Sequence, residues 1–213
     1  MDAKFASAID SVLLHALQAI EQLDCSQPIN AEELSCELQQ RFESGDALLG
    51  AESRWRLSKY ALVSWIDEML VNHAWEGSKW WSNNVLEAKI FQSRLCSVRF
   101  YEMAQEATTH NDRDALQVFY YCVVLGFRGV YGEKGEVSEL TVGPRLPATL
   151  EQWMRGVDRQ LWYARENYDA FTSQAPQMAS ISGAPPNIGR FRVVAWALAA
   201  AVLFIVNLVV YQA

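Results

Sequence analysis

Two adjacent carboxylates inside an apolar stretch are the residues of this chain best placed to do chemistry. Asp67 and Glu68 lie in ALVSWIDEMLV, and no other carboxylate pair is embedded in such a stretch. Paired carboxylates can divide general acid and base work when their surroundings separate their pKa values. They can also bind a basic partner or hydrogen-bond donors without any catalysis. Catalysis needs a second titratable group, such as a histidine, and a pocket, and the sequence specifies neither.

The helical period predicts which way this pair points. At about 100° per residue, Leu62, Trp65 and Leu70 share one apolar arc of the helix. The opposite arc carries the polar side chains of Ser64, Asp67, Glu68 and Asn72. This arc has two non-catalytic interpretations. It is either an ordinary solvated stripe, or a recognition stripe that docks a basic partner or ties down a neighbouring element.

A glycine-containing motif stands about 60 residues further along. Gly126, Arg128, Gly129 and Tyr131 belong to GFRGVY, which is not a phosphate loop because Lys134 precedes a glycine instead of following one. The match to a nucleic-acid-binding G-x-x-G is weak in an acidic chain. We therefore expect a structural turn, with a glycine in the left-handed cap position and Arg128 near the negative helix end.

No cofactor, metal or catalytic motif is found. The four cysteines are not arranged as C-x-x-C, and no histidine cluster accompanies them. The chain carries 18 Lys and Arg against 25 Asp and Glu, for a net charge of −7, which makes nucleic acid an unsuitable partner.

The elements that must position these residues are helical nearly throughout. Apolar residues recur at three- to four-residue spacing, Asn30 and Asp112 are predicted helix caps, and Ser82 is predicted to begin a helix that ends near Phe91. The pattern predicts an all-α fold of about seven helices, at residues 3–24, 31–48, 52–74, 82–91, 97–108, 115–126 and 150–170. The centre of the 115–126 helix, VFYYCVVLGF, is apolar on all sides, so we expect this helix to be buried in the core.

The end of the chain predicts a membrane anchor. Residues 193–211 carry no charge, and 19 residues of helix span about 28 Å, close to the apolar thickness of a bilayer. Arg190 and Arg192 precede this stretch, so the positive-inside rule leaves the rest of the chain in the cytoplasm. The predicted division is a cytoplasmic domain at 1–174, a Pro- and Gly-containing linker at 175–190, and a transmembrane anchor at 191–213. Positions able to pack another helix are Ala195, Ala197, Ala199, Ala201 and Asn207.

Taken together, these motifs resemble the DotU/TssL family, the tail-anchored inner-membrane component of bacterial type VI secretion systems. The resemblance covers most of the chain, including the C-terminal apolar stretch. It rests on YALVSWIDE from Tyr60, on Trp75 and Trp80, on Leu86-Glu87 with Phe91, on Phe100-Tyr101-Glu102, and on Tyr120 to Tyr131 ending in LGFRGVY. The stretch at 93–97 lacks the glycine-rich turn expected before Phe100.

The resemblance implies a cytoplasmic domain of two packed helical bundles and a non-enzymatic scaffold role. The expected partners are an IcmF-like inner-membrane protein (TssM), the baseplate protein TssK and, indirectly, an outer-membrane lipoprotein (TssJ). Self-association through the transmembrane helix is also expected. Asp67 and Glu68 then become the expected polar docking site, together with Ser64 and Asn72. Two alternatives remain: a tail-anchored enzyme that uses Asp67 and Glu68 in a helical pocket, and a tail-anchored adaptor outside secretion.

Overall fold

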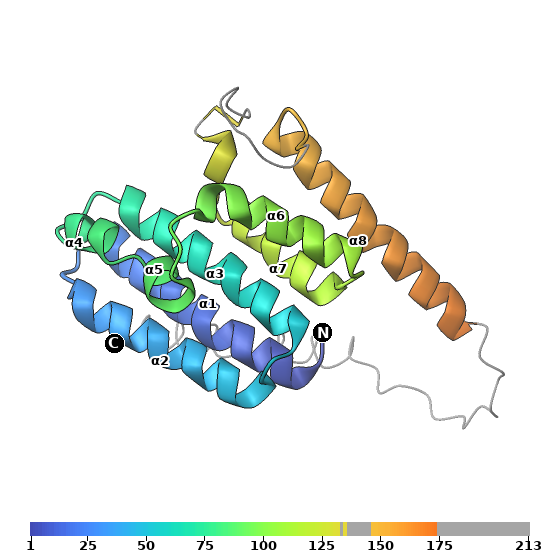
Figure 1. The fold of residues 1–213 in the computed structure, drawn as a ribbon, viewed down its shortest axis with the longest axis horizontal. Helices are drawn as coiled ribbons and strands as arrows, with labels where there is room; N and C mark the ends of the chain where they lie inside the picture. The colour runs from blue at the N-terminus through green and yellow to red at the C-terminus, as the bar shows by residue number, and fades with distance from the viewer. Residues whose placement is uncertain (133, 136–145, 174–213) are drawn as a thin grey trace, which may run out of the picture. The chain divides into compact units, whose positions relative to one another are not determined.

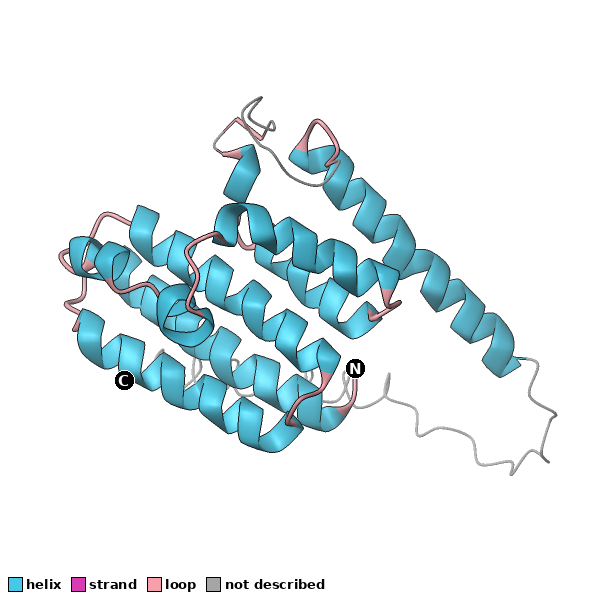
Figure 2. Cartoon of the chain, viewed as in Figure 1, coloured by secondary structure: helices cyan, strands magenta, loops and turns pink. Residues whose placement is uncertain are grey.

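The computed structural model describes residues 1–132, 134–135 and 146–173, and the elements within them are helices (Figures 1 and 2). The all-α fold class is confirmed. The elements are α1 (Ala3–Asp24), α2 (Ala31–Leu49), α3 (Ser53–Asn72), α4 (Ser78–Asn83), α5 (Leu86–Phe91), α6 (Cys96–Thr109), α7 (Arg113–Val124), the 3₁₀ turn η1 (Gly129–Tyr131) and α8 (Leu150–Ser173).

Helix α3 is shared by two groups of helices. It packs with α1 and α2 on one side and with α6 and α7 on the other, and α4 and α5 also contact it. Figure 1 shows α3 running between these two groups. Most of its side chains are buried, polar ones included. A helix in this position is covered over most of its surface, so each buried polar side chain on it needs a partner within the protein.

Short polar side chains begin several helices as the sequence predicts. The Asn30 side chain accepts hydrogen bonds from the backbone N–H groups of Glu32 and Glu33, at 2.9 and 3.3 Å. Asp112 accepts one from Ala115 at 3.4 Å. These contacts satisfy backbone donors that a helix leaves unpaired at its start. Both predicted caps are confirmed.

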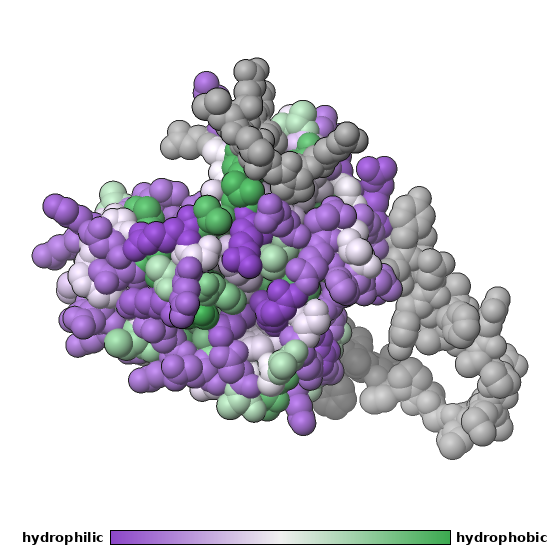
Figure 3. Space-filling view, in the orientation of Figure 1, coloured by the Kyte–Doolittle hydropathy of each residue, from purple (hydrophilic) through white to green (hydrophobic). Residues whose placement is uncertain are grey.

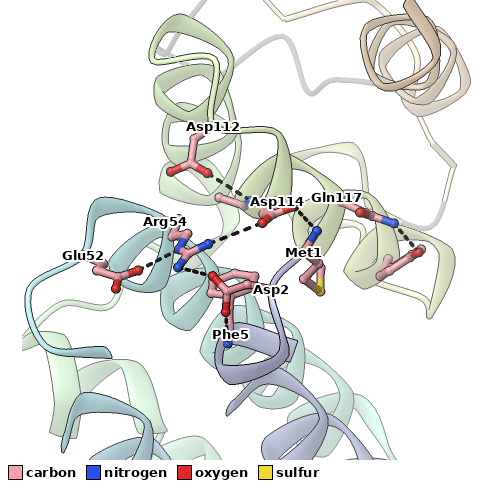
Figure 4. A network of polar contacts seen from close by, with 10 residues as sticks. Met1, Asp2, Phe5, Glu52, Arg54, Asp112, Asp114 and Gln117 are labelled. Carbon is pink, nitrogen blue, oxygen red and sulfur yellow. Dashed lines mark hydrogen bonds and ion pairs between the residues drawn. The ribbon is translucent and has the colours of Figure 1, made fainter. Parts of the chain in front are cut away.

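One arginine joins the starts of three helices. Arg54, near the start of α3, contacts Asp2 before α1 at 2.6 Å, Glu52 at 2.7 Å and Asp114 on α7 at 3.6 Å (Figure 4). Its guanidinium also lies 4.9 Å from the centre of the Phe5 ring. The network connects the first group of helices to the second at one end of α3.

Two predictions about helices are wrong. Ser82 does not begin a helix, because it lies inside α4, where its hydroxyl donates to the backbone oxygen of Lys79. The predicted single helix is instead two short helices, α4 and α5. Helix α7 is not buried on all sides, since Tyr121 and Val124 are 41 % and 56 % exposed. It packs through one face and leaves the other in solvent.

The predicted linker at 175–190 and the predicted anchor at 191–213 lie outside the described residues. Among the residues that are described, no helix is both long enough and apolar enough to cross a membrane.

Candidate functional site

Asp67 is buried at the contact between α3, α4 and α5, with 2 % of its surface exposed. Its Oδ1 accepts hydrogen bonds from the Trp81 indole N–H at 2.9 Å and from the backbone N–H of Leu86 at 2.8 Å. Its Oδ2 accepts from the backbone N–H of Glu87 at 2.8 Å. One carboxylate of α3 therefore holds both the start of α5 and a buried indole of α4.

Glu68 makes the equivalent contact on another side of α3. Its two oxygens accept hydrogen bonds from the backbone N–H groups of Arg128 and Gly129, at 2.6 and 2.9 Å. These donors lie at the start of η1. Adjacent residues of one helix thus fix two segments that stand about 40 residues apart in the sequence.

A third carboxylate, Glu87, was not singled out by its sequence pattern. It is 1 % exposed and accepts hydrogen bonds from the Tyr60 hydroxyl at 2.7 Å and from the backbone N–H groups of Leu95 and Cys96 at 3.1 and 3.0 Å. These two N–H groups lie at the start of α6. A single acid in a helical pattern is solvent-facing by default, so the only sequence signal for Glu87 was its place in the family resemblance.

Asp67, Glu68 and Glu87 share one role, and we call them the carboxylate latch. Each binds a pair of consecutive backbone N–H groups at the start of a following element: α5, η1 or α6. The first N–H groups of a helix lack partners within it, and the helix dipole favours a negative charge at that end. The latch therefore fixes where α5, α6 and η1 begin relative to α3.

Burial shifts the acidity of this region. Desolvation raises the pKa of Asp67 to about 6, against the opposing effect of its hydrogen bonds. Desolvation also raises the pKa of Glu68, and the N–H groups of Arg128 and Gly129 oppose that rise. Burial and the neighbouring carboxylates raise the pKa of the Cys96 thiol to about 12. Cys96 therefore stays protonated at neutral pH, unlike a nucleophilic cysteine.

The GFRGVY motif forms a turn after α7. Gly129 has a φ of +55°, and a Cβ atom there would lie 2.7 Å from the backbone oxygen of Ser97, so only glycine fits. Arg128 donates through its guanidinium to the backbone oxygens of Val123 and Phe127, both at 3.1 Å. These carbonyls belong to the end of α7 and to the residues after it. A cation is favoured there because the helix dipole is negative at that end, as the sequence predicted for Arg128.

Two tyrosines brace the same turn. The Tyr101 hydroxyl of α6 donates to the backbone oxygen of Arg128 at 2.8 Å. The buried Tyr131 donates to the backbone oxygen of Pro147 at 3.0 Å and packs edge-on against Tyr101. The four residues assigned to a turn, Gly126, Arg128, Gly129 and Tyr131, thus lie together, and Gly126 also has a positive φ of +116°.

A hollow of about 300 Å³ opens to solvent beside the latch. Three of the four residues predicted to bind a partner, Asp67, Glu68 and Asn72, line it. The remaining lining residues are Val71, Ser82, Val85, Glu87, Arg94 and Cys96. Ser64 is fully buried and donates to the backbone oxygen of Tyr60 at 2.8 Å. The solvated-stripe interpretation is wrong for Ser64 and Asp67, which are buried, whereas Asn72 at the end of the stripe is exposed.

The histidine that the enzyme alternative would use does not lie beside the carboxylates in the described part of the chain. No histidine lines the hollow, and His73, the closest in sequence, faces Asp24 of α1 at 3.8 Å. Within the described residues, no group of three or more His, Cys, Asp or Glu side chains is placed to hold a metal ion. Asp67 and Glu68 bind backbone N–H groups of the protein itself. This agrees with the interpretation in which the pair ties down neighbouring elements.

Residues 4–213 match the family described as "Type VI secretion system protein DotU". The chain belongs to the DotU family. This confirms the resemblance drawn from the motifs around Asp67 and Gly126, and it identifies the protein as a component of type VI secretion. A comparison with curated proteins gave no match.

Two solved structures share the fold of this DotU-family chain. The cytoplasmic domain of TssL from Acinetobacter baumannii is 20 % identical, with a TM-score of 0.56, and the match covers 73 % of this chain and 97 % of that one. T6SS SciP/TssL from Escherichia Coli Enteroaggregative 042 is 19 % identical, with a TM-score of 0.51, covering 84 % of this chain and 95 % of that one. At these identities the likeness concerns the fold.

Proposed function

We propose that this DotU-family protein is a non-enzymatic, membrane-anchored scaffold of a type VI secretion membrane complex. In this proposal the 191–213 segment anchors it in the bacterial inner membrane, and residues 1–174 lie in the cytoplasm. The scaffold links the IcmF-like protein TssM, and through it TssJ, to the baseplate protein TssK. Self-association would use the small residues Ala195, Ala197, Ala199 and Ala201 and the polar side chain of Asn207 in this segment.

The use of the carboxylates supports a scaffold over an enzyme. A catalytic acid must present its oxygens to a substrate, whereas both oxygens of Asp67 and of Glu68 accept hydrogen bonds from the protein itself. The hollow beside them is open to solvent, as suits a docking site, whereas an enzyme needs an enclosed pocket.

The hollow is the proposed docking site, and its occupant is a basic side chain from a partner. Asp67 and Glu87 form a buried acidic floor, while Glu68 is half-buried and Asn72 is exposed. The apolar rim, which includes Val71 and Val85, suits the methylene stem of a lysine or arginine whose charged head reaches Glu68. Asp67 has almost no exposed surface, so it contributes to the site by holding the floor of the hollow in place.

A substitution at the exposed edge tests this site without removing the latch. Asn72→Arg places a bulky positive charge at the mouth of the hollow. We expect it to reduce the amount of TssM or TssK that co-purifies with the full-length chain by at least fivefold. Gln40→Arg is the matched control, because Gln40 is also an exposed helical residue but lies on α2, away from the hollow.

The control should change recovery of either partner by less than twofold. Both variants should keep the helical circular dichroism of the parent chain, since both side chains are exposed. If Asn72→Arg leaves the recovery of TssM and TssK unchanged, the hollow is not a docking site. If neither partner co-purifies with the unmodified chain, the scaffold assignment itself fails.

A further inference from the structure

The segment from α4 to the start of α6 exposes basic side chains in an otherwise acidic protein. Between residues 77 and 101 the sequence contains four basic residues and a single acid, Glu87. Glu87 is buried and holds the start of α6, so it offers no carboxylate to solvent. The exposed charges of the segment from α4 to the start of α6 are therefore basic, in a chain with a net charge of −7.

Three of these cations are held in fixed positions. The Lys89 amine donates to the Ser35 hydroxyl at 2.8 Å and lies 5.0 Å from the centre of the Trp80 ring. The Arg94 guanidinium donates to the backbone oxygens of Ser82 and Asn83, at 3.1 and 2.7 Å.

The third cation, Arg99, lies 5.5 Å from the centre of the Tyr60 ring. Ring faces and carbonyl oxygens attract a cation without cancelling its charge. Lys89, Arg94 and Arg99 form no ion pair with any residue in the described part of the chain.

An exposed apolar side chain stands between two of the cations. Leu95 is 62 % exposed, directly follows Arg94 and precedes Arg99 by about one helical turn. Figure 3 shows the described surface in this orientation as mainly hydrophilic, with small, separate hydrophobic areas. Arginine is enriched at protein–protein contact points, and here two arginines flank an exposed apolar side chain.

We propose that Lys89, Arg94 and Arg99 form a docking surface for a carboxylate-rich segment of a protein partner, with Leu95 as its apolar contact. Fixed guanidinium groups favour this occupant, because Arg pairs with carboxylates in a directional, two-point geometry. A lipid surface attracts basic residues without any such fixed geometry. Arg94 also lines the hollow beside Glu68, whereas Lys89 and Arg99 do not, so a test at Lys89 and Arg99 is separate from the Asn72→Arg test.

Carbodiimide coupling of the full-length chain in its native membranes tests the chemistry directly, because it joins amines to carboxylates that touch them. Lys89 supplies one amine, and the Arg94→Lys and Arg99→Lys variants supply others while keeping the charge. We expect cross-links from these amines to Asp or Glu of another protein, at least fivefold more abundant than from the exposed Lys4 on α1. The internal Lys59–Asp46 pair, at 2.7 Å, should couple in every sample and reports that the reaction worked.

A charge-reversal pair then measures the contribution of the surface. Lys89→Glu with Arg99→Glu should lower co-purification of the cross-linked protein at least tenfold. Lys4→Glu with Arg159→Glu changes the net charge equally at exposed positions outside the surface, and should lower it less than twofold.

Two results would overturn the proposal. One is the absence of intermolecular cross-links from all three positions while Lys59 couples to Asp46. The other is protection of the Lys89 amine from acetic anhydride in phosphatidylglycerol nanodiscs, but not in phosphatidylcholine nanodiscs, with no other protein present. That second result would identify the bilayer as the occupant.

Discussion

At the scale of single residues, Asp67 shows how a buried charge is retained. An isolated carboxylate in this position would be costly, and its cost is offset because three donors converge on it. Removing the acceptor while the donors stay buried is therefore more damaging than losing an ordinary surface contact. Glu87, with three donors of its own, follows the same rule.

We expect Asp67→Asn to lower the free energy of unfolding by about 2 kcal/mol, because its amide N–H₂ would face the backbone N–H of Leu86 or Glu87. Urea unfolding of the full-length chain in mild detergent, followed by tryptophan fluorescence, measures this change. Ser58→Ala is the control on the same helix. The Ser58 hydroxyl is buried with no hydrogen-bond partner in the described structure, so its removal should be neutral or slightly stabilising. Equal stability of Asp67→Asn and the parent chain would refute the structural role of this carboxylate.

The raised pKa of Asp67 predicts a pH dependence of stability. The folded pKa of about 6 lies above the value of about 3.9 typical of unfolded chains, so folding takes up a proton between these pH values. The contribution of Asp67 to stability therefore grows as the pH falls. Between pH 7.5 and pH 5 the unfolding free energy of the parent chain should rise by about 1 kcal/mol relative to Asp67→Asn, which cannot titrate at this position. A difference between the two chains that is constant over this range would contradict the raised pKa.

At the scale of elements, close packing of α2 against α3 depends on a missing side chain. Gly45 lies within α2, and a Cβ atom there would stand 2.2 Å from the Trp55 ring. The Trp55 indole N–H donates to Asp46 at 2.8 Å, and Lys59 contacts the other oxygen of Asp46 at 2.7 Å. The glycine therefore admits the buried indole that joins the two helices.

We expect Gly45→Ala to lower the unfolding free energy by about 2 kcal/mol, because overpacking against a buried ring forces the two helices apart. Gly156→Ala is the matched control. Gly156 lies within α8 with open space around its Cα, so alanine there should raise stability by up to about 1 kcal/mol through its higher helix propensity. Thermal unfolding of the two variants distinguishes these signs, and stabilisation by Gly45→Ala would show that α2 and α3 are not packed this closely.

At the scale of the whole molecule, the chain divides by composition into an acidic helical part and an apolar end. The described residues up to 170 form one compact unit, with a buried core that extends from Phe5 on α1 to Trp153 on α8. A unit of this size buries enough apolar surface to fold without a membrane. The apolar stretch at 193–211 contains only one polar side chain, Asn207.

Deletion of residues 191–213 should therefore release a chain that stays in the supernatant after ultracentrifugation without detergent. Its circular dichroism should remain helical, and its thermal transition should remain cooperative. The full-length chain should sediment with membranes and resist extraction by alkaline carbonate. Aggregation of the shortened chain, or loss of its transition, would mean that the deleted residues belong to the core.

The sequence by itself determined most of the helices and the family. Helix periodicity, the Asn30 and Asp112 caps and the glycines of the turn are local signals, since each depends on residues within a few positions. The motifs around Asp67 and Gly126 carried the family resemblance, which the match over residues 4–213 confirmed. The anchor and the partner contacts stay predictions.

Only the tertiary structure decided what the carboxylates do. The donors bound by Asp67 lie 14 to 20 residues away in the sequence, and those bound by Glu68 lie 60 and 61 residues away. No local pattern records such contacts, and an amphipathic period treats a polar arc as solvent-facing. Because α3 is shared by two groups of helices, its polar arc is buried as well. The pair that first suggested acid–base chemistry therefore binds the starts of neighbouring elements.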